Sequence, residues 1–239
     1  MNKLSYIILT LSCALLWACG PVETERNSDF GIQGIDVSHH QQDVDWNTVA
    51  TQDFHFAFLK ASEGLQHVDP NFSDNWASAK TSGLVRGAYH FFRANKAAED
   101  QLRNFTNRVE LQPGDLPPVL DIETLDGATR EELIAGVRTW LYLAEIKYGV
   151  KPVIYTNLKF YYRYLAGQFD DYPYWMARYG TKEPTVGPGL NLAFWQYGDR
   201  GRVAGIKGNV DLNVFYGDQA AFDELLIRES EIFTVNQDW

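Results

Sequence analysis

The sequence predicts an α/β fold, a single irregular TIM-like barrel of the form (β/α)5(β)3. Eight apolar, strand-like runs recur between residues 32 and 215, and a helix-like segment follows each of the first five. Alternating strands and helices are typical of a mostly parallel sheet, and eight such strands favour closure into a barrel. The last three runs are joined by Gly/Pro-rich loops without room for full helices. With 239 residues, 45% of them hydrophobic, and no repeat or interior linker, the chain suits one domain.

The predicted strands are short runs rich in β-branched and aromatic residues. The fourth begins at Pro117-Pro118, where a strand can do without backbone donors, and ends at Asp121-Ile122-Glu123. In chain order the eight runs are residues 32–38, 54–61, 84–92, 116–123, 152–157, 174–179, 192–197 and 210–215.

The helix ends are marked by capping residues. Asp45 is a candidate N-cap for a short first helix. Asp69-Pro70 predicts the start of the second helix, with the aspartate as N-cap, and Gly83 ends it. A Thr-x-x-Glu capping box at 129–132 opens a long amphipathic helix that Gly149 stops. The predicted helices cover residues 45–50, 69–83, 97–109, 129–148, 159–165 and 218–228.

Asp121 and Glu123 are the first candidates for chemistry. Side chains alternate along a strand, so these two carboxyl groups face the same way, ~7 Å apart. Like charges that close raise one pKa, which keeps one carboxyl protonated beside another that stays ionised. The alternative is a solvated Asp-x-Glu at a strand exit.

Other polar and aromatic residues recur at the ends of separate strands. The carboxyl ends of the strands form the active-site face of such a barrel, so these side chains are expected to share one site. The shared position favours a functional interpretation of the carboxyl pair. In strand order these residues are Asp36, Lys60 with Glu63, Tyr89 with His90, Asp121 with Glu123, Tyr155 with Asn157, Trp175 with Arg178, Trp195 with Gln196, and Asp211 with Asn213.

The sequence disfavours nucleic acid and metal ions as ligands. The formal net charge is −10 and no Lys/Arg-rich block is present, which argues against nucleic acid. Asp36, His39, His40 and His90 could be metal ligands. Adjacent histidines at a strand end point to opposite faces, however, so hydrogen-bonded histidines are the preferred interpretation and no metal is expected.

Residues 1–18 are predicted to be a signal peptide, because the apolar run 6–18 is too short to span a bilayer comfortably. The sequence Leu16-Trp17-Ala18-Cys19 resembles a bacterial lipobox, which implies cleavage before Cys19 and a lipid on its thiol. A plain signal peptide cleaved elsewhere is the alternative. Residues 19–29 are polar and aperiodic, as in a tether. We expect an exported envelope protein anchored to a membrane, whose single remaining cysteine forms no internal disulfide.

Seven short motifs occur in the order found in glycoside hydrolase family 25 lysozymes, and the chain resembles this family from about Phe30 to Tyr216. The resemblance implies an irregular eight-stranded barrel that hydrolyses the β-1,4 bond between N-acetylmuramic acid and N-acetylglucosamine in peptidoglycan. It makes residues 30–239 a catalytic barrel domain. The motifs are Gly34-Ile35-Asp36-Val37-Ser38, Lys60-Ala61-Ser62-Glu63-Gly64, Asp69-Pro70-Asn71-Phe72, Gly87-Ala88-Tyr89-His90-Phe91, Asp121-Ile122-Glu123, Trp195-Gln196-Tyr197 and Val210-Asp211-Leu212-Asn213.

The resemblance also implies roles for the four carboxyl groups. Glu123 matches the general acid. Asp121 would orient the substrate's 2-acetamido group as an internal nucleophile, which predicts retention of configuration. Asp36 and Asp211 would hold sugar hydroxyls and tune the pKa of Glu123. Strand-end carboxylates that cap loop N–H groups are the alternative for these two.

Five further residues are candidate substrate contacts. Tyr89 and Tyr155 would bind the acetamido region, and Trp195 and Trp175 would stack on sugar rings. Core packing is the alternative for Tyr155 and Trp175. Lys60 is either a substrate ligand or half of a buried ion pair with Glu63.

Acid catalysis on a glycoside requires no cofactor, and we expect a monomer that acts on peptidoglycan glycan strands. Two other functions stay open. One is a catalytically silent peptidoglycan-binding protein on the same barrel, and the other is a chitinase-like hydrolase. An intact carboxylate set disfavours both.

Overall fold

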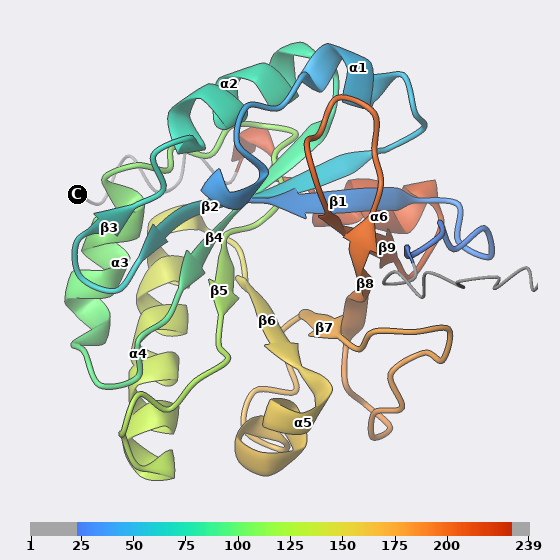
Figure 1. Ribbon diagram of the computed structural model, residues 1–239. Helices are drawn as coiled ribbons and strands as arrows, with labels where there is room; N and C mark the ends of the chain where they lie inside the picture. The colour runs from blue at the N-terminus through green and yellow to red at the C-terminus, as the bar shows by residue number, and fades with distance from the viewer. Residues whose placement is uncertain (1–22, 231–239) are drawn as a thin grey trace, which may run out of the picture.

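The computed structural model describes residues 23–230 and contains a closed barrel of eight strands (Figure 1). The strands are β1 (Gln33–Val37), β2 (Phe56–Glu63), β3 (His67–Val68), β4 (Val85–Phe91), β5 (Val119–Asp121), β6 (Val153–Asn157), β7 (Tyr174–Ala177), β8 (Leu192–Gly201) and β9 (Val210–Phe215). The helices are α1 (Trp46–Ala50), α2 (Phe72–Thr81), α3 (Ala98–Thr106), α4 (Arg130–Tyr148), α5 (Leu158–Phe160) and α6 (Gln219–Leu225), with a 3-10 turn η1 (His39–Gln41) and a π-helical turn η2 (Tyr161–Leu165).

The predicted barrel is confirmed. The strand order is β1-β9-β8-β7-β6-β5-β4-β2, and a parallel pairing of β1 with β2 closes the ring. Among the eight strands of this ring, β9 alone runs against its neighbours, pairing antiparallel with both β1 and β8. The two-residue strand β3 forms a hairpin on β2 outside the ring and was not predicted, because two residues carry no periodic signal.

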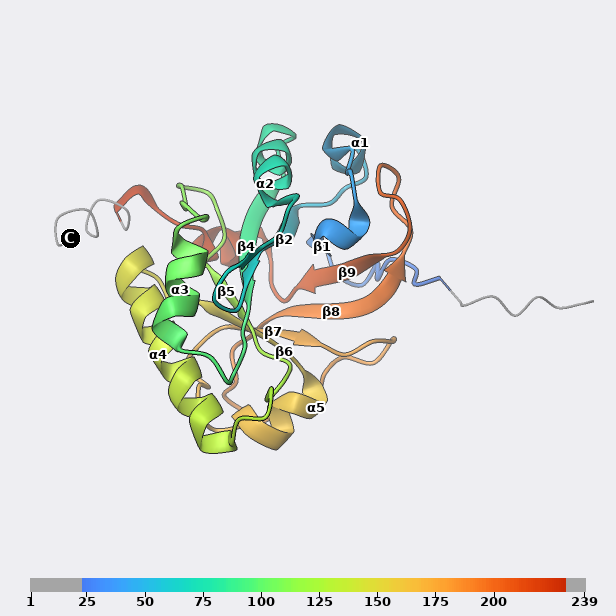
Figure 2. The ribbon, with the colours of Figure 1, turned by 60° about the vertical axis from the view of Figure 1, so that its left-hand side comes forward.

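Helices cover the first two thirds of the barrel and leave the last third to loops. Figure 2 shows α3 and α4 side by side on one flank. Asp45 caps α1, the Thr129/Glu132 capping box opens α4, and Gly149 ends it in the left-handed conformation, all as predicted.

The predicted start of the second helix is wrong by two residues. Helix α2 starts at Phe72 with Asn71 as N-cap, not at Asp69-Pro70. The Asp69 side chain instead accepts from the backbone N–H of Asn71 and from both the backbone and the ring of His39. His39, which lies 30 residues away along the chain, thus binds the carboxylate that the local sequence predicts to be a helix cap.

Aromatic rings fill the barrel interior. Phe58 stacks on Trp175 with ring centroids 4.3 Å apart, and Phe56 meets Phe194 edge-on at 5.2 Å. Gly34 and Gly87 make room for these rings. A Cβ at Gly34 would lie 2.3 Å from the Phe56 ring, and one at Gly87 would lie 2.5 Å from the Phe58 ring. The glycines of two sequence motifs therefore permit a close approach inside the barrel.

The described part of the predicted tether contacts the barrel. Thr24 donates its N–H to Arg200 O at 3.0 Å and packs where Gly198 has no side chain. Asn27 donates its N–H to the hydroxyl of Tyr197. Arg26 lies 4.0 Å above the Phe54 ring. The signal-peptide and Cys19 predictions fall on residues outside those described. No helix within residues 23–230 is long and apolar enough to cross a bilayer.

Candidate active site

Asp36 lies at the centre of a buried hydrogen-bond network at the carboxyl end of the barrel. Its Oδ2 accepts from Gln196 Nε2 and Asn213 Nδ2, both at 2.8 Å. Tyr155 Oη donates to Gln196 Oε1 at 2.8 Å, and Trp175 Nε1 donates to Asn213 Oδ1 at 2.8 Å. Each amide is thereby fixed with its N–H groups toward Asp36. The network holds the carboxylate in one orientation.

Asp211 faces Asp36 directly across the antiparallel pair of β9 and β1. Burial and the negative charge of Asp36 raise the pKa of Asp211 to about 9. Burial also raises the pKa of Asp36, although the two amide donors oppose that rise. The pair therefore holds a shared proton at neutral pH.

Asp121 and Glu123 form a second carboxyl pair. Backbone bonds to β6 fix the residue between them, because Ile122 donates to Tyr155 O at 2.9 Å and accepts from Thr156 Oγ1 at 2.7 Å. Burial and the charge of Glu123 raise the pKa of Asp121 well above its usual range. Burial likewise raises the pKa of Glu123, against hydrogen bonds from Asp121 and Asn157.

Asp121 also carries an unused acceptor. Its Oδ1 is buried and has no hydrogen-bond partner among the described residues. A buried acceptor without a donor is costly, so a bound molecule with an N–H or O–H at this point would gain a hydrogen bond.

Glu123 borders two neighbouring grooves. One, of about 340 Å³, lies toward Thr124, Lys159 and Arg163. The other, of about 390 Å³, lies toward Tyr155 and Tyr179. The half-buried carboxyl thus stands where the two grooves meet and is accessible to a chain-like ligand lying in both. A protonated carboxyl in this position can donate a proton to such a ligand.

Lys60 forms the ion pair that the sequence left as its alternative role. Its Nζ lies 2.6 Å from Glu63 Oε2, and Arg93 binds the same carboxylate. The two cations lower the pKa of Glu63 to about 2 despite partial burial. The positive charge of Lys60 also opposes the rise in the pKa values of Asp121 and Glu123.

Tyr89 joins the carboxyl groups, and its pKa is raised well above the usual range by burial and by Asp36, Asp121 and Asp211. Tyr155 and Trp175 are packed as in the core-packing alternative that the sequence left open, since they are 6% and 2% exposed and their rings lie 4.4 Å apart. Tyr155 also lines the groove beside Tyr179.

Trp195 does not reach the site. Its ring is fully buried on the outer face of β8, and its Nε1 donates to Arg178 O at 2.8 Å. A ring with no free face cannot stack on a sugar. The next residue, Gln196, points inward instead. The exposed aromatic ring of the groove is Tyr179, 55% exposed. It lies four residues after Trp175, and residues i, i+2 and i+4 of an extended strand share a face, so this spacing could have revealed it.

The histidines differ from expectation in geometry. His39 and His40 lie in the turn η1, not on a strand, and their rings approach to 4.1 Å. His39 Nδ1 lies 2.7 Å from Asp69 Oδ2, and the buried His90 lies 2.8 Å from Ser62 Oγ. Within residues 23–230 no group of three or more His, Cys, Asp or Glu side chains could hold a metal ion.

Comparison with known proteins places these features in a family. The model of glycosyl hydrolases family 25 matches residues 35–206, which include Asp36, Asp121 and Glu123. The chain belongs to this family. It is a glycoside hydrolase, and the resemblance drawn from the sequence motifs is confirmed. Asp211, the fourth carboxyl position, lies beyond the matched residues but pairs directly with Asp36.

Individual proteins are also similar in sequence to this family 25 enzyme. Lysozyme M1 of Streptomyces globisporus is 36% identical over 215 residues, covering 84% of this chain and 71% of the relative. The YegX protein of Escherichia coli O157:H7 is 45% identical over 195 residues, covering 80% and 71%.

Solved structures show the same barrel. A family 25 glycosyl hydrolase from Bacillus anthracis superposes with a TM-score of 0.79 at 32% identity, covering 86% of this chain and 98% of that one. The bacterial lysozyme of Streptomyces coelicolor gives 0.77 at 33% identity, covering 82% and 97%.

Proposed function

We propose that this enzyme is a muramidase that hydrolyses the β-1,4 bond between N-acetylmuramic acid and N-acetylglucosamine in peptidoglycan. The observation that carries the proposal is the Asp121–Glu123 pair, with Glu123 at the junction of two grooves and Asp121 Oδ1 without a donor. Relatives named as lysozymes in Streptomyces globisporus and Clostridium acetobutylicum support this substrate.

In the first step Glu123 is the general acid. Burial raises the pKa of its carboxyl above the ordinary value, which favours the protonated form that the step requires. It gives its proton to the glycosidic oxygen as the bond from that oxygen to C1 breaks. The departing chain leaves as a neutral alcohol, and an oxocarbenium-like centre develops at C1.

Asp121 orients the internal nucleophile. The N–H of the 2-acetamido group on the muramic acid supplies the donor that Asp121 Oδ1 lacks. That hydrogen bond favours the ionised form of Asp121, which leaves the proton of the pair on Glu123. The acetamido oxygen then bonds to C1 from the opposite face as the leaving group departs, forming a cyclic oxazolinium intermediate without a covalent enzyme adduct.

Water completes the reaction. Glu123, now ionised, takes a proton from water as the water oxygen bonds to C1 and the ring of the intermediate opens. The acetamido group is restored, and Glu123 ends the cycle protonated. Two inversions at C1 give net retention of configuration, with one water consumed for each bond cleaved.

The remaining polar residues support binding. Asp36 and Asp211 bind sugar hydroxyls through hydrogen bonds, and the negative charge of Asp36 raises the pKa of Glu123. Tyr89 lies among the carboxyl groups and contacts the acetamido region. Tyr179 offers the exposed ring on which a sugar can stack.

The enzyme is further proposed to act as a monomeric lipoprotein of the cell envelope. A lipid on Cys19 would anchor it to a membrane, as the lipobox-like sequence indicates. Because Thr24 is bonded to β8, an extended chain from Cys19 to Thr24 spans at most about 18 Å. The barrel would therefore act on wall close to the membrane surface.

Analysis of the product ends tests the proposed bond. In this experiment peptidoglycan is incubated with the purified protein, and the new reducing sugar is identified by borohydride reduction followed by mass spectrometry. Muropeptides that end in reduced muramic acid are expected. Products that end in reduced N-acetylglucosamine would contradict the bond assignment.

A further inference from the structure

Two cations border the groove next to Glu123 in a protein of strongly negative charge. Lys159 and Arg163 line this groove, and both side chains are exposed. Neither has an ion pair with any residue of the described range 23–230. The chain as a whole carries a formal charge of −10, so its acidic residues outnumber its basic ones, yet neither of these two cations is paired with a carboxylate of the described range.

The segment that carries the cations is firmly placed. The two residues are four apart on the turns α5 and η2, which puts them on one face. Asn157 Oδ1 caps the segment by accepting from Phe160 N at 2.9 Å.

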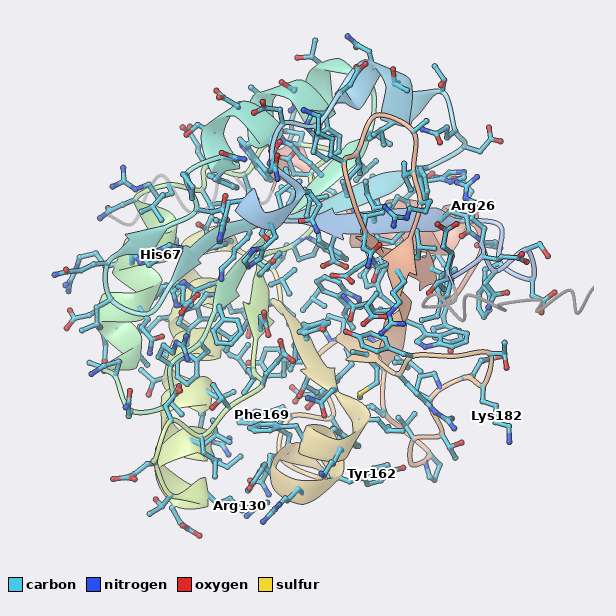
Figure 3. The ribbon with its side chains drawn as sticks, viewed as in Figure 1. Arg26, His67, Arg130, Tyr162, Phe169 and Lys182 are labelled. Atoms are coloured by element: carbon cyan, nitrogen blue, oxygen red, sulfur yellow. The ribbon has the colours of Figure 1, made fainter. Side chains whose placement is uncertain are left out.

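The carboxyl-terminal half of this segment also contacts the rest of the protein. Leu165 is fully buried, and Tyr162, labelled in Figure 3, donates its hydroxyl to Thr185 O at 2.6 Å. The guanidinium of Arg163 lies 5.3 Å from the centroid of the Tyr164 ring. The backbone that carries both cations is therefore held in place, which lowers the entropy cost of binding an anion.

The chemistry of the substrate identifies the anion. Within a glycan strand the sugar rings carry hydroxyl and acetamido groups, which are neutral. The negative charge lies on the peptide attached to the lactyl group of muramic acid, whose side chains and terminus end in carboxylates. A cation pair beside the catalytic carboxyl thus matches the peptide and not the glycan backbone.

We propose that Lys159 and Arg163 form a subsite for a carboxylate of the muramic-acid-linked peptide, which makes the enzyme prefer peptide-bearing glycan with free carboxylates. This inference rests on the proposed muramidase function and names the part of the substrate that the groove beside Glu123 receives. Arg163 can bind a carboxylate through two parallel N–H groups, and Lys159 adds a point charge.

A comparison of two enzymes on two substrates tests the subsite. One substrate is native peptidoglycan, and the other is the same material with its carboxylates converted to amides. Wild type should cleave the native substrate with a kcat/KM about fivefold higher, as expected for two partly exposed charge pairs. The double variant Lys159→Gln/Arg163→Gln should cleave both equally, at the wild-type rate for the amidated substrate.

Lys207→Gln is the matched control, because it removes one exposed positive charge from a different groove. It should keep the wild-type preference. The preference should also shrink as salt concentration rises. A wild type that cleaves both substrates equally, or a double variant that is slowed equally on both, would overturn the subsite. If wild type cleaves neither substrate, the muramidase proposal fails, and the subsite fails with it.

Discussion

Asp36 of β1 and Asp211 of β9 are direct partners across an antiparallel strand pair, so two carboxyl groups face one another inside the barrel mouth. Like charges placed directly opposite in a sheet are destabilising. The protein accommodates the pair by burying a proton with it, which is why the pKa of Asp211 is raised to about 9. The Gln196 and Asn213 amides stabilise the Asp36 carboxylate from the other side.

The first prediction concerns Asp211→Asn. The folded state binds more protons than the unfolded state between the ordinary pKa near 4 and the raised value near 9, so wild-type stability falls as pH rises through this window. The Asp211→Asn variant has no carboxyl group at this position, so it does not lose stability in this way as pH rises. Its free energy of unfolding relative to wild type should rise with pH by at most about 1.4 kcal/mol per unit. Denaturant unfolding from pH 5 to pH 9 measures it, with the exposed Asp43→Asn as control. A pH-independent difference would contradict the shared proton.

The second prediction concerns the motif glycines. Gly34→Ala would place a methyl group 2.3 Å from the Phe56 ring in a packed barrel interior. We expect a loss of about 1–3 kcal/mol in the free energy of unfolding, as for other overpacked cores. Gly187→Ala is the matched control, because a Cβ there meets nothing within 4 Å. Equal stability of the two variants would argue against the close approach.

These residues also show how far the sequence could lead. The sequence could place Asp36, Tyr89, Asp121 and Tyr155 at one site, because each lies at the carboxyl end of a predicted parallel strand and these ends form one face of a barrel. Strand β8 is apolar on both faces, as Phe194 and Trp195 show, and such a strand does not reveal which face is inside.

The sequence likewise could not predict contacts between residues that lie far apart along the chain. The bonds from Tyr155 to Gln196 and from Gln196 to Asp36 join strands 41 and 160 residues apart. Local patterns state which strands exist, but only closure of the barrel brings these ends together. The same holds for Asp69, whose bond to His39 replaces the expected helix cap.

The third prediction concerns the anchor. Cys19→Ser removes the thiol that the proposed lipid requires, so the protein should move from the membrane fraction to the soluble fraction after cell disruption. The measurement is immunoblotting of the two fractions, with Cys13→Ser as the control that keeps the anchor. An unchanged distribution in the Cys19 variant would contradict lipidation at this residue.

The fourth prediction concerns stereochemistry. Because the proposed nucleophile belongs to the substrate and attacks from the face opposite the leaving group, the first-formed product should have the β configuration. Proton NMR of a soluble peptidoglycan fragment during early turnover reports the anomer directly. Asp121→Asn should slow this reaction about 10²-fold or more without changing the configuration. An initial α anomer would show that water attacks C1 directly.

The most direct test of the account is the hydrolysis of peptidoglycan by Glu123→Gln beside wild type. Glutamine keeps the shape of the side chain but has no acidic proton, so kcat/KM should fall about 10²–10⁴-fold while the melting temperature stays close to that of wild type. Glu131→Gln, an exposed position on the first turn of α4, should be as active as wild type. A folded Glu123→Gln variant with activity within a few fold of wild type would contradict the assignment of Glu123 as the acid.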